Sequence, residues 1–194
     1  MNNTITQKKS LEILNILSRD EDPDVRYAVA NNPNITPEIL EELLWDDNPR
    51  VKYAIAGNPG ISPELLDYLS KDENYFVRVS IARNPSISVE LLDYLSGDKN
   101  SDVRCEVAMN SNTSPQTLSK LADVSNITIK TAIAKNLNTS LNILEKLSTE
   151  NNSDVNWYIA KNPNTSTETL EYLSVDKNHL VKIAVIRNLN LSGE

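Results

Sequence analysis

The sequence predicts an all-α fold, an α-solenoid built from 26-residue repeats of two short helices, and three observations lead to this prediction. The first is an unbroken 26-residue period. The second is the helical spacing of apolar residues within each period, and the third is a recurrent set of helix-start residues. The period is clearest in one apolar column, whose members are Val25, Val51, Val77, Val103, Ile129, Val155 and Val181.

The first helix of each repeat is expected around this column. In the first repeat, Val25, Ala28 and Val29 stand at i, i+3 and i+4, the spacing of a buried helical face. An Asp or Asn three residues before each column member is suited to cap the helix. These residues are Asp22, Asn48, Asn74, Asn100, Asn126, Asn152 and Asn178.

An asparagine recurs seven residues after each member of the apolar column. Several of these asparagines precede proline, which disfavours the α region for the residue before it, so the first helix should be only about two turns long. Their amides are interpreted as pairing with loop backbone of their own and the adjoining repeat, rather than as a binding site. They are Asn32, Asn58, Asn84, Asn110, Asn136, Asn162 and Asn188.

The second helix has the stronger start signal. It opens with Ser or Thr at the cap, often with proline at the first helical position and a glutamate in the first turn, as in Thr36, Pro37 and Glu38. Ile39, Leu40 and Leu43 form its apolar stripe in the first repeat. The caps are Thr36, Ser62, Ser88, Ser114, Ser140 and Ser166.

A single repeat has too few large apolar side chains to offset the entropy of ordering its chain, so repeats must stack on one another. The predicted organisation is an N-terminal tail at 1–9 and one helical-repeat domain at 10–194. Within that domain we expect a half-repeat cap at 10–24 carrying Leu14 and Leu17, six repeats at 25–180, and a partial repeat at 181–194.

The C-terminal segment leaves two interpretations open. Ser192 stands where a further second helix would begin, so the chain could belong to a longer repeat array. Alternatively, Ile186, Leu189 and Leu191 form an apolar end that another subunit covers, which allows a homodimer through this end.

The stretches "VRYAVANNPNITPEILEELL" and "VKYAIAGNPGISPELLDYLS" resemble the leucine-rich repeat variant family, and the resemblance covers residues 10–192. It implies a right-handed superhelix of alternating α and 3₁₀ helices without a sheet, which allows one helix of each repeat to be 3₁₀ or both to be α. One member type holds an iron-sulfur centre in an amino-terminal cysteine cluster. Residues 1–10 contain no cysteine, so no cluster is expected here.

In a stacked array, each position of the repeat becomes a column on the surface, and one such column is basic. It contains Arg26, Lys52, Arg78, Arg104, Lys130 and Lys182, is broken by Asn156, and is expected on the exposed side of the first helix. Tyr27, Tyr53 and Trp157 stand beside it. These nine residues are the predicted partner-binding set. The alternative is a series of ion pairs with the acidic column Asp20, Asp46, Asp72, Asp98, Glu150 and Asp176.

Residues 103–154 depart most from the pattern. Val124 replaces an aspartate of the acidic column, and Lys120 and Lys146 interrupt an acidic stretch of the second helices. Either this region is a local binding patch, or it has drifted neutrally in a tolerant array. Glu106 and Tyr158 replace alanines in another column. Either they are functional insertions, or they lie at the edge of the apolar stripe with their polar ends in water.

The functional expectation is a non-catalytic scaffold that binds another protein or an acidic peptide through the basic column. Cys105 and His179 are the only cysteine and histidine, and they are far apart in the sequence. We therefore expect no metal site, no cofactor and no enzymatic activity. Nucleic-acid binding by the same column is the alternative, although a net charge of −8 argues mildly against it. Without an apolar run of signal or membrane length, the protein is expected to be cytoplasmic.

Overall fold

The computed structural model describes residues 2–191, with side chains described from residue 7 to 189. These residues form fourteen α-helices and no strand, so the predicted fold class is confirmed. The chain divides into two compact units, 1–91 and 92–194, where the sequence predicted one domain. A repeat array divides in this way because each repeat contacts only its neighbours. The side chain of Leu191 and the predicted cap Ser192 lie outside the described residues.

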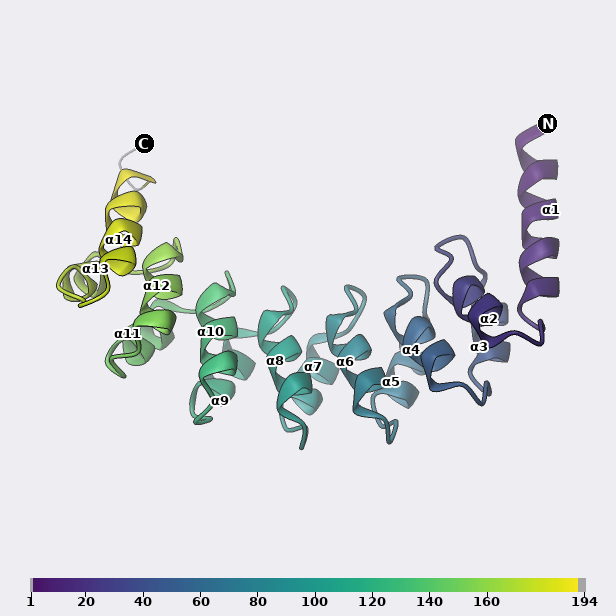
Figure 1. Ribbon diagram of the computed structural model, residues 1–194, viewed down its shortest axis with the longest axis horizontal. Coiled ribbons are helices and arrows are strands. Elements are labelled where there is room, and N and C mark those ends of the chain that lie inside the picture. The colour runs from purple at the N-terminus through teal and green to yellow at the C-terminus, as the bar shows by residue number, and fades with distance from the viewer. Residues whose placement is uncertain (1, 192–194) are drawn as a thin grey trace. The chain divides into compact units, whose positions relative to one another are not determined.

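In the first unit, the first helices of successive repeats lie side by side, and so the repeats stack (Figure 1). The first helices here are α2 (Pro23–Ala30), α4 (Pro49–Gly57) and α6 (Tyr75–Arg83). Between them in the chain come the second helices α3 (Pro37–Leu43) and α5 (Pro63–Leu69), preceded by α1 (Asn2–Leu17). Helix α7 (Val89–Leu95) crosses the boundary between the units.

The second unit repeats this arrangement, with contacts from α8 to α10, from α10 to α12 and from α12 to α14. Its first helices are α8 (Ser101–Met109), α10 (Ile127–Lys135), α12 (Ser153–Lys161) and α14 (His179–Leu191). Its second helices are α9 (Pro115–Ala122), α11 (Leu141–Ser148) and α13 (Thr167–Leu173). Within each unit, the first helices of successive repeats therefore pack against one another.

The apolar column and most of the predicted caps are confirmed, but Ala28 is exposed and the side chains of Thr36 and Ser140 make no cap hydrogen bond. From Val51 to Val181, every described member of the apolar column is at most 2% exposed, whereas Val25 at the start of the array is half-buried. The side chain of Asn48 accepts a hydrogen bond from the backbone N–H of Arg50 at 2.9 Å, as expected of an N-cap. Ser62 likewise accepts from the backbone N–H of Leu65 at 3.3 Å. The helices thus begin where their capping residues stand.

Two predictions about helix bounds were wrong, and the 3₁₀ helix that the family resemblance allows is not found in the described repeats. Helix α1 begins at Asn2, so most of the expected tail at 1–9 is helical; it contains no proline or glycine that would stop a helix. Helix α14 continues past Asn188 to Leu191, where no proline follows the asparagine. The missing proline permits this extension but does not explain it, because α10 ends at Lys135 although Asn136 is also followed by leucine. Both helices of each described repeat are α, because seven to nine residues exceed the usual length of a 3₁₀ segment.

The recurrent asparagines join adjacent repeats, as predicted. The Nδ2 group of Asn136 donates to the backbone oxygens of Ala108 at 2.8 Å and Asn110 at 2.9 Å, both in the preceding repeat. Its Oδ1 accepts from the N–H of Asn138 in its own corner at 2.8 Å. We call this set of bonds the asparagine ladder. Asn58, Asn84, Asn162 and Asn188 make the same kind of bond to the repeat before them.

Candidate partner-binding surface

The basic column turns toward the acidic column of the same repeat instead of toward solvent. The Nε and Nη2 groups of Arg26 donate to the two carboxylate oxygens of Asp46, at 2.5 and 3.1 Å. The Nη1 group of Arg26 donates to the backbone oxygens of Asp20 at 2.7 Å and Glu21 at 3.0 Å. The guanidinium therefore joins the corner before α2 to the equivalent corner before α4.

Other members of the column are engaged in the same way. Lys52 lies 3.8 Å from a carboxylate oxygen of Asp72, and Lys130 forms an ion pair with Glu150. Arg78 is only 5% exposed, and its Nη1 group donates to the backbone oxygen of Asp72 at 2.7 Å. The expectation that the column lies on the exposed side of the helix was therefore wrong for Arg78. The reason is that the Arg78 side chain folds back onto the carbonyl oxygens of Asp72 and Glu73 in the corner before its own helix.

Two repeats break this pairing in opposite ways. Arg104 donates to the backbone oxygen of Asp98 at 2.5 Å, but its acidic position is Val124, and its buried Nε has no hydrogen-bond partner. In the sixth repeat the acidic residue Asp176 is present, but Asn156 replaces the basic residue. The Nδ2 group of Asn156 donates to Asp176 at 2.9 Å, whereas its buried Oδ1 has no partner.

The pairing sets the ionisation of the acidic column. The hydrogen bond from Arg26 holds the pKa of Asp46 below its usual value, and this effect outweighs the burial that would raise it. At Asp176, burial is the largest influence and raises the pKa. Hydrogen bonds from Asn156, from the N–H of Asn178 and from Ser153 together lower the pKa by more than burial raises it. The net shift of the Asp176 pKa is therefore downward. Both groups are carboxylates at neutral pH.

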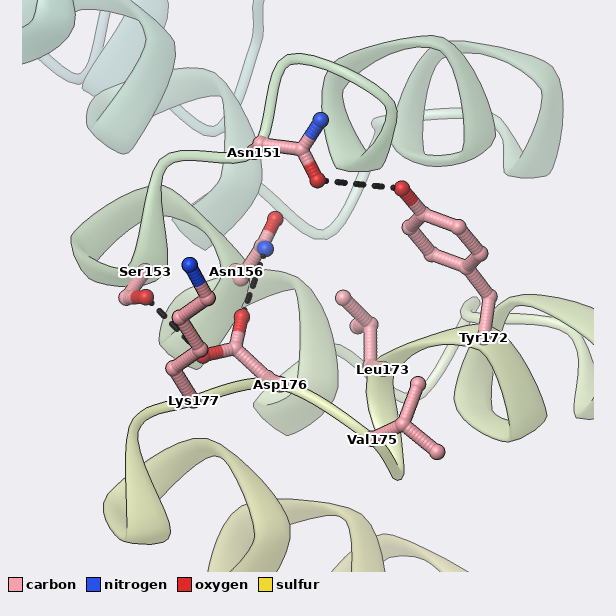
Figure 2. A pocket seen from close by; sticks show the side chains of 8 residues that line it. All are labelled: Asn151, Ser153, Asn156, Tyr172, Leu173, Val175, Asp176 and Lys177. Atoms are coloured by element: carbon pink, nitrogen blue, oxygen red, sulfur yellow. Dashed lines mark hydrogen bonds between the residues drawn. The ribbon is translucent and has the colours of Figure 1, made fainter.

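A hollow of about 280 Å³ opens beside Asp176 (Figure 2). The hydroxyl of Ser153 donates to Asp176 at 2.9 Å on one side. On another side, the hydroxyl of Tyr172 donates to the Oδ1 of Asn151 at 3.1 Å. Asn151 has a φ of 55°, which places it in the left-handed region that Asn tolerates better than most residues. The acidic column thus borders a small polar cavity in this repeat.

The three predicted aromatic residues have different surroundings. The Arg50 guanidinium carbon lies 5.0 Å from the ring centroid of Tyr27, and Tyr53 is half-buried on α4. Trp157 is half-buried and meets Tyr158 edge to face, with 4.5 Å between ring centroids. The two rings therefore form a pair on α12.

Two lysines complete a cluster around these rings that the sequence prediction missed. The Nζ atom of Lys161 lies 4.3 Å from the Trp157 ring centroid, and that of Lys135 lies 4.3 Å from the Tyr158 ring centroid. Lys135 comes from α10 and is exposed, as is Lys161 at the end of α12. We call Lys135, Trp157, Tyr158 and Lys161 the aromatic-lysine cluster. The tyrosine in an alanine column was the one sequence signal that could have located it.

In the irregular region at 103–154, the lysines of the second helices form ion pairs with carboxylates of this protein. Lys120 lies 2.6 and 2.8 Å from the two carboxylate oxygens of Asp93, and Lys146 forms an ion pair with Asp123. These pairs join neighbouring second helices. Lys182, by contrast, is exposed.

The described residues show neither a metal site nor a membrane span. No cluster of three or more His, Cys, Asp or Glu side chains within them is placed to hold a metal ion. None of their helices is both long and apolar enough to cross a bilayer.

Comparison with solved structures shows where this fold has been seen. A structure described as a leucine-rich repeat variant with a novel repetitive structural motif aligns with a TM-score of 0.70 at 19% identity. The alignment covers 93% of this chain and 72% of that one. In fold, the chain is similar to a leucine-rich repeat variant. At this level of identity the similarity shows the fold alone.

Two engineered proteins, both structural-genomics targets, align more weakly, with TM-scores of 0.46 and 0.42. They are 17% and 20% identical to this chain, and each alignment covers 93% of it. The alignments cover 95% and 97% of the engineered chains. No protein-family profile and no curated protein matches the sequence.

Proposed function

We propose that this protein is a non-catalytic, cytoplasmic scaffold that binds an acidic segment of another protein at the aromatic-lysine cluster. The observation that carries the proposal is the geometry of α12, where two half-buried rings lie beneath two exposed ammonium groups, each 4.3 Å from a ring centroid. A helical repeat array offers such clusters on an extended surface.

The cluster combines the two properties that a peptide-binding surface needs. Trp157 and Tyr158 supply large apolar faces that lose little side-chain entropy on binding, as expected of interface anchors. Lys135 and Lys161 make no ion pair with a carboxylate among the described residues. An ammonium held over a ring still has N–H donors to offer, so it can bind an incoming carboxylate.

The basic column supports this proposal less than the sequence suggested. Its charges are largely used within the repeats, as in the pairs of Arg26 with Asp46 and Lys130 with Glu150. The same pairing weakens the case for nucleic-acid binding, since a neutralised column gains little from phosphates.

The test is a comparison of captured proteins. Immobilised wild-type protein should capture a reproducible set of partners from cells of its source, and the double variant Lys135→Glu/Lys161→Glu should lose most of that set. Lys99→Glu is the matched control, because Lys99 is an exposed lysine on the corner before α8. Capture that is identical for all three proteins, or no reproducible capture by the wild type, would contradict the proposal.

A second candidate is self-association through α14. On this helix Ile183, Ile186 and Leu189 are 40%, 60% and 47% exposed, which is an unusual series of apolar residues for one helix surface. Light scattering over a concentration series would then show dimers that Ile186→Glu abolishes. A monomer at all concentrations would remove this candidate.

A further inference from the structure

The fold contains a binding niche for a guanidinium group in several repeats, and arginines of the chain fill it. In the first, third and fourth repeats the Nη1 group of the arginine donates to a backbone oxygen six residues earlier. Its partners are Asp20 at 2.7 Å, Asp72 at 2.7 Å and Asp98 at 2.5 Å. In the first repeat the carboxylate of Asp46 completes the niche. The recurrence shows that the backbone corner accommodates this planar cation, and the first repeat shows that the acidic column can complete the niche.

The sixth repeat has the acidic half of the niche without the arginine. Asn156 occupies the arginine position and is too short to span from one corner to the other. Ser153 and Asn156 each donate one hydrogen bond to the carboxylate of Asp176, but neither carries a positive charge. The negative charge that arginine neutralises in the first repeat is therefore not matched by a cation within the niche.

A second feature of this repeat also calls for a hydrogen-bond donor. Asn156 is only 2% exposed, and its Oδ1 has no partner. Since Nδ2 donates to Asp176, Oδ1 must be the atom that points the other way, toward the Asn151 side of the hollow (Figure 2). A buried acceptor without a hydrogen bond is unfavourable, and a donor that enters the hollow as Asn156 rotates toward it would supply the missing bond.

The hollow is of a size for a small group. Its volume of about 280 Å³ lies below the roughly 300–1,000 Å³ of pockets that enclose drug-sized molecules. Tyr172 on one wall offers an aromatic surface, and Leu173 and Val175 offer apolar surface for an alkyl stem. Lys177 also lines the hollow, and the charge of Lys182 reaches Asp176, so two nearby cations will keep the affinity modest.

We propose that this hollow binds the guanidinium group of an arginine side chain presented by a partner protein. The guanidinium donates to Asp176 and to the Oδ1 of Asn156, and so replaces the arginine that other repeats provide from within. The site is separate from the aromatic-lysine cluster, and it stands whether or not that cluster binds a partner.

The experiment titrates ¹⁵N-labelled full-length protein with N-acetyl-arginine amide and follows amide chemical shifts. Saturable shifts should centre on Ser153, Asn156 and Tyr172, with a dissociation constant on the order of millimolar. N-acetyl-citrulline amide, which has a similar shape without the charge, should bind at least about tenfold more weakly. Lysine amide that binds as tightly as the arginine probe would overturn the assignment to guanidinium, because the site should favour a planar donor.

Two variants and a control locate the site. Asp176→Asn should lose about tenfold or more in affinity. Asn156→Arg should abolish binding, because the protein's own guanidinium then fills the niche. Because arginine occupies this position in three other repeats, Asn156→Arg should fold and should raise the melting temperature. Asp123→Asn removes an exposed carboxylate elsewhere and should bind as the wild type does. Absence of saturable shifts in the wild type, or equal binding by wild type and Asn156→Arg, would overturn the proposal.

Discussion

The side-chain amide of Asn58 lies 2.7 Å from the backbone oxygen of Ala30, which is 28 residues earlier in the chain. The same amide lies 3.2 Å from the backbone oxygen of Asn32, and its Oδ1 accepts from the N–H of Gly60 at 2.8 Å. One buried side chain therefore fixes the corner of its own repeat and satisfies carbonyls of the preceding repeat. The asparagine ladder makes the stability of each repeat depend on the repeat beside it.

Asn58→Ala should destabilise the protein because it removes the donor to Ala30 and the acceptor for Gly60 at a site only 2% exposed. We expect a loss of about 1–3 kcal/mol in the free energy of unfolding, measured by urea denaturation.

Asn32→Ala is the matched control for this variant. The Oδ1 of Asn32 accepts from the N–H of Asn34 at 2.9 Å. Asn32 stands in the first repeat, and its side-chain amide does not make the ladder bond to backbone oxygens of a preceding repeat. Its replacement should lower stability by less than about 1 kcal/mol. Equal losses for the two variants would mean that the bonds between repeats contribute nothing beyond the corner itself.

Most of the fold could be predicted because the features that set it are local. Caps such as Asn48 and Ser62 and the valine column recur with one period, and each satisfies a requirement of its own helix. The extent of α1 was missed because residues 2–9 lie outside the repeat, so the period does not place a helix there, and helix ends are set partly by packing.

The candidate site was harder to predict because it depends on where long side chains turn. The period places Arg78 in a column but does not show that its head group folds back onto the corner before its own helix. The acidic column recurs with the same period as the basic column, and this pattern indicates ion pairing as the alternative to partner binding. The two positions where one partner is missing, Val124 and Asn156, were visible in the sequence as breaks, yet only the structure shows the atoms they leave without partners.

The pair of Arg26 and Asp46 should make stability depend on acid pH. The hydrogen bond from Arg26 lowers the pKa of Asp46 below the unfolded value of about 3.9. A lowered pKa means that the stabilisation is complete above the unfolded value and is lost as the pH falls through the folded-state value. Asp46→Asn should therefore be about 1–3 kcal/mol less stable than wild type at pH 7. That difference should shrink progressively below about pH 4, in urea denaturation at a series of pH values. A difference independent of pH would contradict this account of the pair.

Val124→Asp should stabilise the protein by giving Arg104 the carboxylate that its repeat lacks. The buried Nε of Arg104 has no partner, and a hydrogen bond to a charged group contributes about 1.5–3 kcal/mol. The corner must also change, since the N–H of Asn126 now donates to the backbone oxygen of Val124 at 2.8 Å. We therefore expect a net gain of about 1 kcal/mol, or a melting temperature about 2–4 °C higher by calorimetry. Val124→Asn should gain less, and a lower melting temperature for Val124→Asp would contradict the prediction.

Thr139→Ile should be nearly neutral, although Thr139 is fully buried. Its hydroxyl donates to the backbone oxygen of Ile133 at 2.6 Å, but that oxygen also accepts from the N–H of Asn136 at 3.0 Å and so stays paired. The first unit already has isoleucine at this position, as in Ile61. The free energy of unfolding should change by less than about 1 kcal/mol in denaturant titration. A loss above about 2 kcal/mol would show that the two units pack this position differently.

The central claim is that these short helices are stable only against neighbouring repeats, and circular dichroism of one isolated repeat tests it most directly. A peptide spanning 126–151 contains α10 and α11 with their N-caps Asn126 and Ser140 and their apolar stripes but no adjoining repeat. The account predicts little helix in this peptide and no cooperative thermal transition, whereas the whole chain should show both. A peptide that folds cooperatively on its own into the two helices would contradict it.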